Sequence, residues 1–212
     1  MAETTRPRRA DAARNRERLL AAAAAVFGER GLDAPLEEVA RRAGVSIGTL
    51  YNHFPAREDF FDAIFPERLA KLDRIAEAAL SDPDPWNGFV VFIEGLFALQ
   101  AEDRGLNDAL VRRFPLAAEV SAACQRGFAN LVEIMARAKA SGQLRDDFEA
   151  SDVATLMWAM SQVIRESIDV APDAWRRCLA FYLDGLRATA AHPIDVRPLT
   201  EEQIDRRHDG PR

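Results

Sequence analysis

A short stretch that ends in a proline restricts the fold more than any other part of the chain. Ser46 is a residue type that caps helices, and its hydroxyl can accept the backbone N–H of Thr49. Pro55 disfavours helical geometry in the residue before it, so a helix that begins after Ser46 ends at about Phe54. Leu50 and Phe54, four residues apart, share one face of that helix. The sequence therefore predicts a short helix with one buried stripe and an uncharged, largely polar outer face.

The residues before this helix predict a second helix and a turn between the two. Residues 36–43 carry apolar side chains at helical spacing, at Leu36, Val39, Ala40 and Ala43. Gly44 follows at the position where a left-handed C-cap residue is favoured. A helix, a glycine-containing turn and a second helix form the unit that places its second helix in a DNA major groove.

The turn and the second helix contain the run Gly44-Val45-Ser46-x-Gly48-Thr49-Leu50-Tyr51-x-His53-Phe54-x-x-Arg57-Glu58. This run resembles the DNA-binding motif of the tetracycline-repressor (TetR) family, and the resemblance covers about residues 15–62. The rest of the chain is similar to the family only in its helical pattern and length. The resemblance implies an all-α fold of about nine helices, with an N-terminal three-helix helix-turn-helix domain and a helical ligand-binding and dimerisation domain.

The expected division of the chain follows from the motif and from composition. We expect a disordered basic arm at residues 1–10, the helix-turn-helix domain at 11–56, the ligand-binding and dimerisation domain at 57–191, and a disordered tail at 192–212. The first helix is predicted over residues 11–30, where apolar residues recur every three or four positions. The arm either follows DNA phosphates or enters a minor groove, or it is a solvated tail.

The resemblance also implies which side chains contact DNA. The expected residues are Ser46, Ile47, Gly48, Thr49, Tyr51, Asn52, His53 and Arg57. Thr49, Tyr51 and His53 match positions that bond phosphates or meet bases at the groove wall. Arg57 matches a family position at the start of the fourth helix, where a basic side chain and free backbone N–H groups hold a phosphate.

Three further residues of the motif match positions that face base edges. They are Ile47, Gly48 and Asn52. Ile47 can contact a thymine methyl but cannot form a bidentate bond to guanine, whereas Asn52 can pair with adenine N6 and N7. We therefore expect some A·T preference at the centre of each half-site.

The charge distribution agrees with DNA binding by the N-terminal part alone. The net charge is −6, yet residues 1–60 hold ten arginines against nine acidic residues, whereas residues 61–212 hold 18 basic against 25 acidic residues. Six of the arginines lie within the first 18 residues. Positive charge is thus concentrated next to the motif, and the acidic remainder resists non-specific adhesion to DNA.

Long apolar periodicities predict the helices of the second domain, at about 57–80, 86–102, a short one to about 114, 116–141, 150–169 and 173–190. The resemblance implies a ligand pocket among them. Its candidate lining residues are Phe65, Leu69, Phe89, Phe92, Glu94, Phe97, Phe114, Phe128, Met135, Trp158 and Met160. Most of these apolar residues are expected to be core, and some to line the cavity. Glu94 has apolar helical neighbours, so its carboxylate is expected to be partly buried and to meet a cationic ligand or an arginine.

The last two helices are expected to form the dimer interface. Their apolar stripes are Val153, Leu156, Met157, Met160 and Ile164, and Trp175, Leu179, Tyr182, Leu183 and Leu186. Two antiparallel amphipathic helices can pair with a symmetry mate into a four-helix bundle, as the family does. The alternative is that both stripes face the internal core. We favour the dimer, because a two-fold protein on palindromic DNA requires one.

Composition and motifs argue against several other classes of protein. The sequence contains no paired-carboxylate, nucleophile–base or glycine-rich phosphate constellation, so no catalytic residue, cofactor or metal site is expected. Cys124 and Cys178 are interpreted as free thiols. The absence of a long apolar run or a leader segment predicts a cytoplasmic protein.

The combined expectation is a ligand-responsive, dimeric regulator, more specifically a repressor. It would bind palindromic double-stranded operator DNA and be released by a small apolar or aromatic effector. The alternative is a DNA-binding regulator that is controlled by a protein partner or acts without a ligand.

Overall fold

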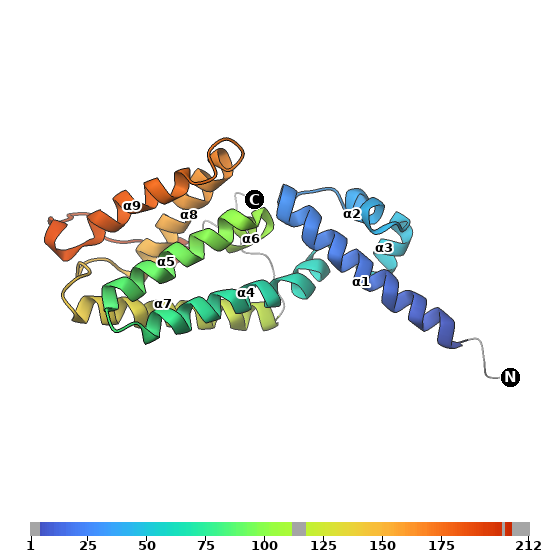
Figure 1. Cartoon of the computed structure of the whole chain (residues 1–212), viewed down its shortest axis with the longest axis horizontal. Coiled ribbons are helices and arrows are strands. Elements are labelled where there is room, and N and C mark those ends of the chain that lie inside the picture. The colour runs from blue at the N-terminus through green and yellow to red at the C-terminus, as the bar shows by residue number, and fades with distance from the viewer. Residues whose placement is uncertain (1–4, 112–117, 201, 205–212) are drawn as a thin grey trace.

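The computed structural model describes residues 5–111, 118–200 and 202–204, and within them the chain forms helices and no β-strand. The helices are α1 (Thr5–Arg30), α2 (Leu36–Ala43), α3 (Ile47–His53), α4 (Glu58–Ser81), α5 (Pro85–Glu102), α6 (Arg104–Val111), α7 (Ala118–Ala140), α8 (Ala150–Ser167), α9 (Ala174–Leu186) and the 3-10 turn η1 (Ala188–Ala190). This confirms the predicted all-α class. The molecule is elongated: α1, α2 and α3 form an N-terminal unit at one end, and α4 leads from it into the remaining helices (Figure 1).

The N-terminal unit has its own apolar core, to which the start of α4 contributes. Leu19 and Phe27 of α1 are buried together with Leu50 of α3 and Phe60 of α4. The Phe27 ring meets the Phe60 ring edge-on, with 6.1 Å between centroids, and the Phe54 ring stacks on Phe60 at 4.1 Å. These rings fix both the end of α3 and the beginning of α4, so α3 is held rigidly between α1 and α4.

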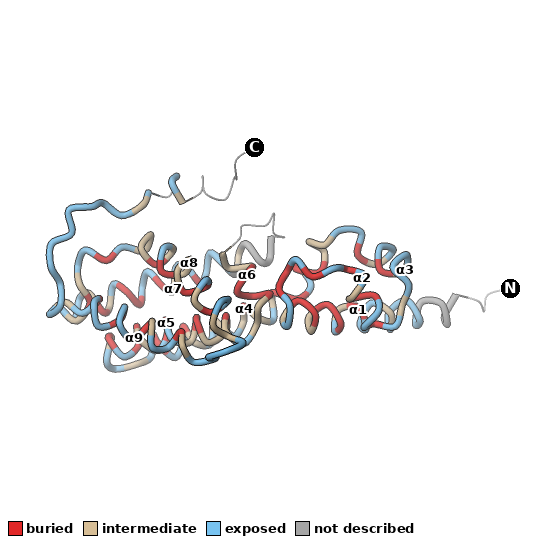
Figure 2. Tube along the Cα trace, turned by 90° about the horizontal axis from the view of Figure 1, so that it is seen from above, coloured by how far each residue is buried: buried red, intermediate tan, exposed pale blue. Residues whose placement is uncertain are grey.

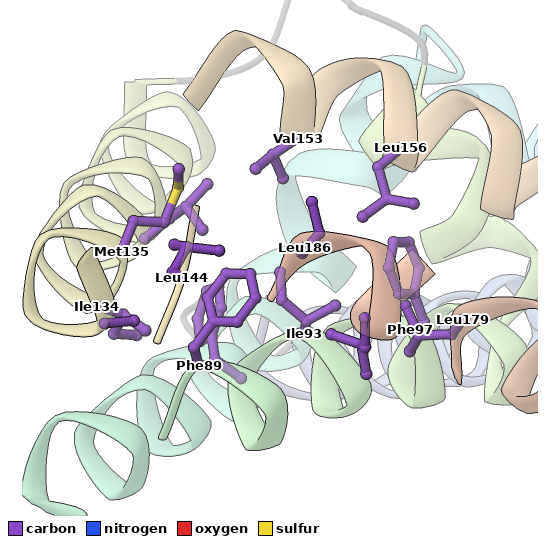
Figure 3. Close-up of a cluster of buried hydrophobic side chains, with 14 of the residues drawn as sticks. Phe89, Ile93, Phe97, Ile134, Met135, Leu144, Val153, Leu156, Leu179 and Leu186 are labelled. Carbon is purple, nitrogen blue, oxygen red and sulfur yellow. The ribbon is translucent and has the colours of Figure 1, made fainter. Parts of the chain in front are cut away.

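A second apolar core lies between the later part of α4 and helices α5, α7, α8 and α9. Figure 3 shows Phe89, Ile93 and Phe97 of α5 facing side chains from the other helices. Buried residues recur along the helices that surround the two cores, whereas residues 10–18 of α1 include none (Figure 2). The second core and the N-terminal core are separate clusters, and α4 contributes to both.

Polar contacts connect the two parts of the molecule near α6. Arg68 of α4 donates to the carbonyl oxygen of Ala24 in α1 at 2.9 Å and forms an ion pair with Asp103 at 2.8 Å. Asp108 of α6 accepts a hydrogen bond from the backbone N–H of Leu32, in the loop after α1, at 3.0 Å. Both α4 and α6 therefore hold the later part of α1.

The first helix is longer than predicted. It begins at Thr5, whereas residues 1–10 were expected to be disordered, so the expectation is wrong for residues 5–10. Pro7 lies in the first turn, where its missing N–H removes no helical hydrogen bond. The alanines and arginines that follow have high helix propensity. Residues 1–4 lie outside the described part of the chain.

Beyond η1 the chain continues without helix to residue 200. None of the described helices is long and apolar enough to cross a membrane. Cys124 is exposed and Cys178 half-buried, and both are free thiols.

Candidate nucleic-acid interface

The turn between α2 and α3 has the geometry that the sequence predicts. Gly44 adopts a left-handed conformation, with φ 67° and ψ 37°. Its N–H donates to the carbonyl oxygen of Arg41 at 3.1 Å, and the N–H of Val45 donates to that of Ala40 at 3.0 Å. These two bonds form a Schellman motif, which satisfies the last carbonyl groups of α2. The turn therefore sets a defined angle between α2 and α3.

Helix α3 is capped at its start and buried along one stripe. The Ser46 hydroxyl accepts the N–H of Thr49 at 3.1 Å, and the two hydroxyl oxygens lie 2.9 Å apart. Leu50 is fully buried, and so is Phe54 just after the helix. The capping bond and both inward side chains agree with the prediction made from the sequence.

The outer face of α3 presents uncharged side chains to solvent. Ser46, Ile47, Gly48, Tyr51 and Asn52 are exposed. Thr49 and His53 are half-buried at the edges of this face. Seven of the eight residues expected to contact DNA therefore lie together on one accessible surface, which we call the α3 face.

Arg57 is oriented differently from the phosphate-binding role that the resemblance implies. Its guanidinium donates to the carbonyl oxygens of Leu32 and Ala34, the latter at 2.7 Å, and lies 5.9 Å from the centroid of the Phe27 ring. The side chain is half-buried. The Arg57 side chain points inward because it bonds these two carbonyl groups of the loop between α1 and α2. In this structure Arg57 thus stabilises the N-terminal unit beside the α3 face.

Ion pairs hold α1 against α2 on the surface of the same unit. Arg42 donates two hydrogen bonds to the carboxylate of Glu29, at 2.7 and 2.8 Å, and Arg30 pairs with Glu38. The hydrogen bond from Arg42 holds the pKa of Glu29 below its ordinary value. Because α2 supports α3, these pairs help to fix the orientation of the α3 face.

The residues expected to line a ligand pocket do not form one group. Phe65 and Leu69 belong to the N-terminal core, whereas Phe89, Phe92, Phe97, Met135 and Met160 are buried in the second core. Trp158 is half-buried, and Phe114 lies outside the described residues.

Two of the pocket candidates are on the surface. Phe128 of α7 is 53% exposed, so it lines no enclosed cavity. Glu94 is exposed, which makes the predicted burial of its carboxylate wrong. The physical reason is that Val91, one turn earlier, is itself 38% exposed, so the apolar neighbours of Glu94 do not form a closed surface around it.

The expected dimer stripes face the core of the protomer itself. Eight of their ten residues are buried there: Val153, Leu156, Met160, Ile164, Trp175, Leu179, Leu183 and Leu186. Figure 3 shows Val153, Leu156, Leu179 and Leu186 among the side chains of α5 and α7. Met157 also packs on this core, and Tyr182 is 43% exposed. The apolar stripes therefore complete the internal core, which is the alternative stated above. Only the opposite faces of α8 and α9 remain accessible to a partner.

The structure also reveals polar residues that the sequence reasoning did not single out. Gln100 on α5, Asn107 and Asp108 on α6 and Ser161 on α8 are all buried. Gln100 lies three residues after Phe97 and seven after Ile93, so a polar side chain within an apolar stripe was the available signal.

Comparisons with known proteins match both parts of the chain. Residues 19–64 match the model for bacterial regulatory proteins of the tetR family, and residues 84–188 match the C-terminal domain of SbtR-like transcriptional regulators. The first match covers the later part of α1, then α2, α3 and the start of α4, and the second covers α5 to α9.

Individual relatives agree with these matches. The transcriptional repressor BepR of Brucella suis is 29% identical over 166 residues, which cover 72% of this chain and 79% of BepR. The crystal structure of the TetR transcriptional regulator SCO0520 from Streptomyces coelicolor has 31% identity and a TM-score of 0.51, and the match covers 81% of this chain and 98% of that one. FadR from Bacillus subtilis, solved in complex with stearoyl-CoA, shares the fold with a TM-score of 0.58 at 19% identity, over 83% of this chain and 99% of FadR.

Proposed function

Because the chain belongs to the TetR family of bacterial transcriptional regulators, we propose that it is a dimeric repressor of palindromic operator DNA that a small, mostly apolar molecule releases. It would act in the cytoplasm, where bacterial DNA lies. The observation that carries the DNA-binding part is the α3 face: an exposed, uncharged polar surface on a short helix that a cap, a Schellman turn and stacked rings hold rigidly.

The residues of the α3 face would make different kinds of contact with DNA. Tyr51 and Asn52 are exposed at the end of α3, where a hydroxyl can bond a phosphate and an amide can pair with an adenine edge. Ile47 would contact a thymine methyl. Gly48 would allow DNA to approach the backbone of α3 closely, because it has no side chain on this exposed face. The position of a Cβ there is open, with only the Ser46 hydroxyl oxygen nearby, at 3.9 Å. Arg57 would act indirectly, by holding the loop before α2.

A dimer would use the outward face of α9. Phe181 is 64% exposed and Tyr182 43% exposed, which is unusual for large aromatic side chains without a partner. Gly185, four residues after Phe181, has open space around the position of a Cβ. In a two-fold arrangement an aromatic ring from one protomer can therefore rest on the flat patch at Gly185 of the other.

The proposed release is a shift between two conformations. A palindrome presents half-sites roughly 34–36 Å apart, so both α3 faces engage only when the two N-terminal units are correctly spaced. A ligand that binds more tightly to a conformation with another spacing lowers the affinity for DNA. The loss of DNA affinity is at most the factor by which the ligand's affinities for the two conformations differ. FadR, a regulator with this fold, was solved with stearoyl-CoA, which supports ligand binding as a property the fold permits.

Selection of duplexes from a random pool at low salt, followed by titration of the enriched sequence, tests DNA binding. We expect a palindromic winner, and Asn52→Ala should weaken its binding by about tenfold, since a bidentate contact to a base contributes about 1–3 kcal/mol. Asn87→Ala removes another exposed asparagine, in α5, and should leave binding unchanged. Absence of enrichment at any salt concentration would refute the proposed function.

Sedimentation of two matched variants tests the dimer face. Phe181→Ser should shift the protein to monomer, whereas Phe128→Ser, which changes an exposed phenylalanine of α7, should not. A monomeric wild-type protein, or dissociation caused by Phe128→Ser alone, would refute the α9 interface.

One observation supports control by a protein partner as a second candidate. Phe128 and Val132 lie four residues apart on α7 and are 53% and 43% exposed, so they form an apolar strip on the surface. If Phe128→Ser removed regulation in cells without altering DNA binding or the dimer, this second candidate would replace the small-molecule effector.

A further inference from the structure

Two arginines of α1 differ from the other arginines of the N-terminal unit. Residues 10–57 contain seven arginines and no lysine. Five of the seven are engaged within the protein: Arg14 with Asp11, Arg30 and Arg41 with Glu38, Arg42 with Glu29, and Arg57 with two carbonyl oxygens. The other two, Arg16 and Arg18, are exposed, and no acidic side chain of the described residues pairs with either. We call Arg16 and Arg18 the α1 pair.

The α1 pair lies beside the two ends of α3. The guanidinium of Arg16 is 5.1 Å from the centroid of the Phe54 ring, and Phe54 directly follows α3. Nη1 of Arg18 lies 3.7 Å from the position of a Cβ at Gly44, in the turn before α3. The two guanidinium groups therefore stand at opposite ends of the α3 face.

This placement follows from the helical spacing of α1. Leu19 is buried in the N-terminal core together with Leu50 of α3. Because an α-helix has 3.6 residues per turn, Arg16 and Arg18 lie about 60° and 100° around the α1 axis from Leu19, in opposite directions. Residues 10–18 include no buried residue, and α1 extends past α3 at this end of the molecule (Figure 1). A duplex that meets α3 can therefore also reach the α1 pair.

The α3 face needs charged residues beside it to bind DNA tightly. Its own exposed side chains are uncharged, whereas contacts between basic side chains and phosphates supply a large part of the affinity for duplex DNA. The guanidinium of Arg57 is bound to loop carbonyl groups instead. Helix α3 has seven residues and is thus about 10 Å long, close to the width of about 12 Å of a major groove. Charges beside its two ends are spaced to meet the phosphates that border the groove.

We propose that Arg16 and Arg18 are phosphate-binding residues that hold the DNA strands on the two sides of the major groove that α3 enters. This inference rests on the proposed DNA binding and names the side chains that supply its electrostatic part. A guanidinium can donate two parallel hydrogen bonds to one phosphate. Both side chains are already held in place, Arg16 by the Phe54 ring and Arg18 by a hydrogen bond to Oδ1 of Asn15 at 2.6 Å, so little side-chain freedom is lost on binding.

The salt dependence of duplex binding counts the phosphate contacts. Each contact contributes about 0.9 to the slope of log affinity against log salt concentration, so Arg16→Gln combined with Arg18→Gln should make the slope shallower by about 1.8 for each bound protomer. The titrations use the selected duplex between about 50 and 200 mM salt. As a matched control, Arg126→Gln combined with Arg197→Gln removes two exposed arginines from α7 and from the segment after η1. The control variant has the same net charge as the test variant and should keep the wild-type slope.

A scrambled duplex separates phosphate contacts from base contacts. Phosphates carry no sequence information, so the double glutamine variant should lose affinity for the selected and the scrambled duplex by a similar factor. Asn52→Ala, in contrast, should weaken binding to the selected duplex alone. Arg16→Lys combined with Arg18→Lys keeps both positive charges and should keep most of the slope.

The outcomes separate this inference from the proposed function. A double glutamine variant with the wild-type slope, or an equal change of slope in the control variant, overturns the phosphate role even where a palindrome is enriched. A double glutamine variant that no longer folds, which thermal melting reports, also overturns it, because the α1 pair would then serve the fold. A shallower slope on the scrambled duplex supports the phosphate role even if no palindrome is enriched. A wild-type protein that binds no duplex at low salt overturns both.

Discussion

Replacing Gly44 with alanine isolates the energetic cost of the turn that positions α3. The residue has φ 67° and ψ 37°, a left-handed conformation that costs an L-residue with a side chain about 1–2 kcal/mol. The new Cβ would lie 3.7 Å from Nη1 of Arg18, an ordinary contact, so no steric clash adds to this cost. We therefore expect Gly44→Ala to lower the free energy of unfolding by about 1–2 kcal/mol, or roughly 2–4 °C of melting temperature per kcal/mol in a protein of this size.

Two other glycines provide matched controls. Gly142 has φ 72° and no atom within 4 Å of an added Cβ, so Gly142→Ala should cost a similar amount of stability at the end of α7, far from α3. Gly48 is helical, and alanine is favoured there by about 0.5–1 kcal/mol. Gly48→Ala should therefore stabilise the protein, while its methyl group projects from the α3 face.

Thermal unfolding and operator titration, measured on all three variants, separate stability from DNA recognition. Gly44→Ala should lose both stability and affinity, Gly142→Ala stability alone, and Gly48→Ala affinity alone. Equal melting temperatures for wild type and Gly44→Ala would refute the argument, because they would mean that the turn is not left-handed in solution. A Gly48→Ala variant with undiminished affinity would show that this part of α3 does not approach DNA closely.

Further perturbations test the contacts around the N-terminal unit. Arg57→Ala should destabilise the protein by about 1.5–3 kcal/mol in urea titrations, since it removes a charged donor from two loop carbonyl groups. An unchanged urea midpoint would instead favour a phosphate-binding role for Arg57. Asp108→Ala should lower the melting temperature and speed hydrogen exchange at the N–H of Leu32, which then has no acceptor, whereas unaltered exchange there would contradict the link through α6. Because the pKa of Glu29 is lowered in the folded state, its pairing stabilises above the ordinary value near 4.5 and the effect fades as the pH falls through the lowered value. Glu29→Gln should accordingly melt below wild type at pH 7, and the difference should vanish once the pH falls below the lowered pKa of Glu29. A difference that stays constant with pH would argue against the pair with Arg42.

The N-terminal unit was predictable from sequence because its signals are local. The cap at Ser46, the turn at Gly44 and the break at Pro55 each depend on residues within a few positions, and all three occur as expected. The inward direction of Arg57 was not predictable, because the carbonyl groups that attract it come from a loop more than 20 residues earlier.

Partners of the apolar stripes were not predictable for a different reason. Helical periodicity identifies which side of α8 and α9 is apolar but not what that side packs against. The stripe from Val153 to Ile164 completes a core in which α5 supplies Phe89 and Phe97, and only the tertiary structure shows this. The burial of Gln100 was not predicted, because one amide in an apolar stripe is a weak signal until its lack of hydrogen-bond partners is known.

Helix α4 contributes to a different core at each end, and Pro66 lies between the two. It contains 24 residues, so at 1.5 Å per residue it is about 36 Å long. A tilt of only about 5° about one end carries the other end through about 3 Å, which is comparable to the length of a hydrogen bond. A small rotation of α4 within the second core therefore produces a larger displacement at its N-terminal end. That displacement is large enough to make or break hydrogen bonds of polar groups at that end.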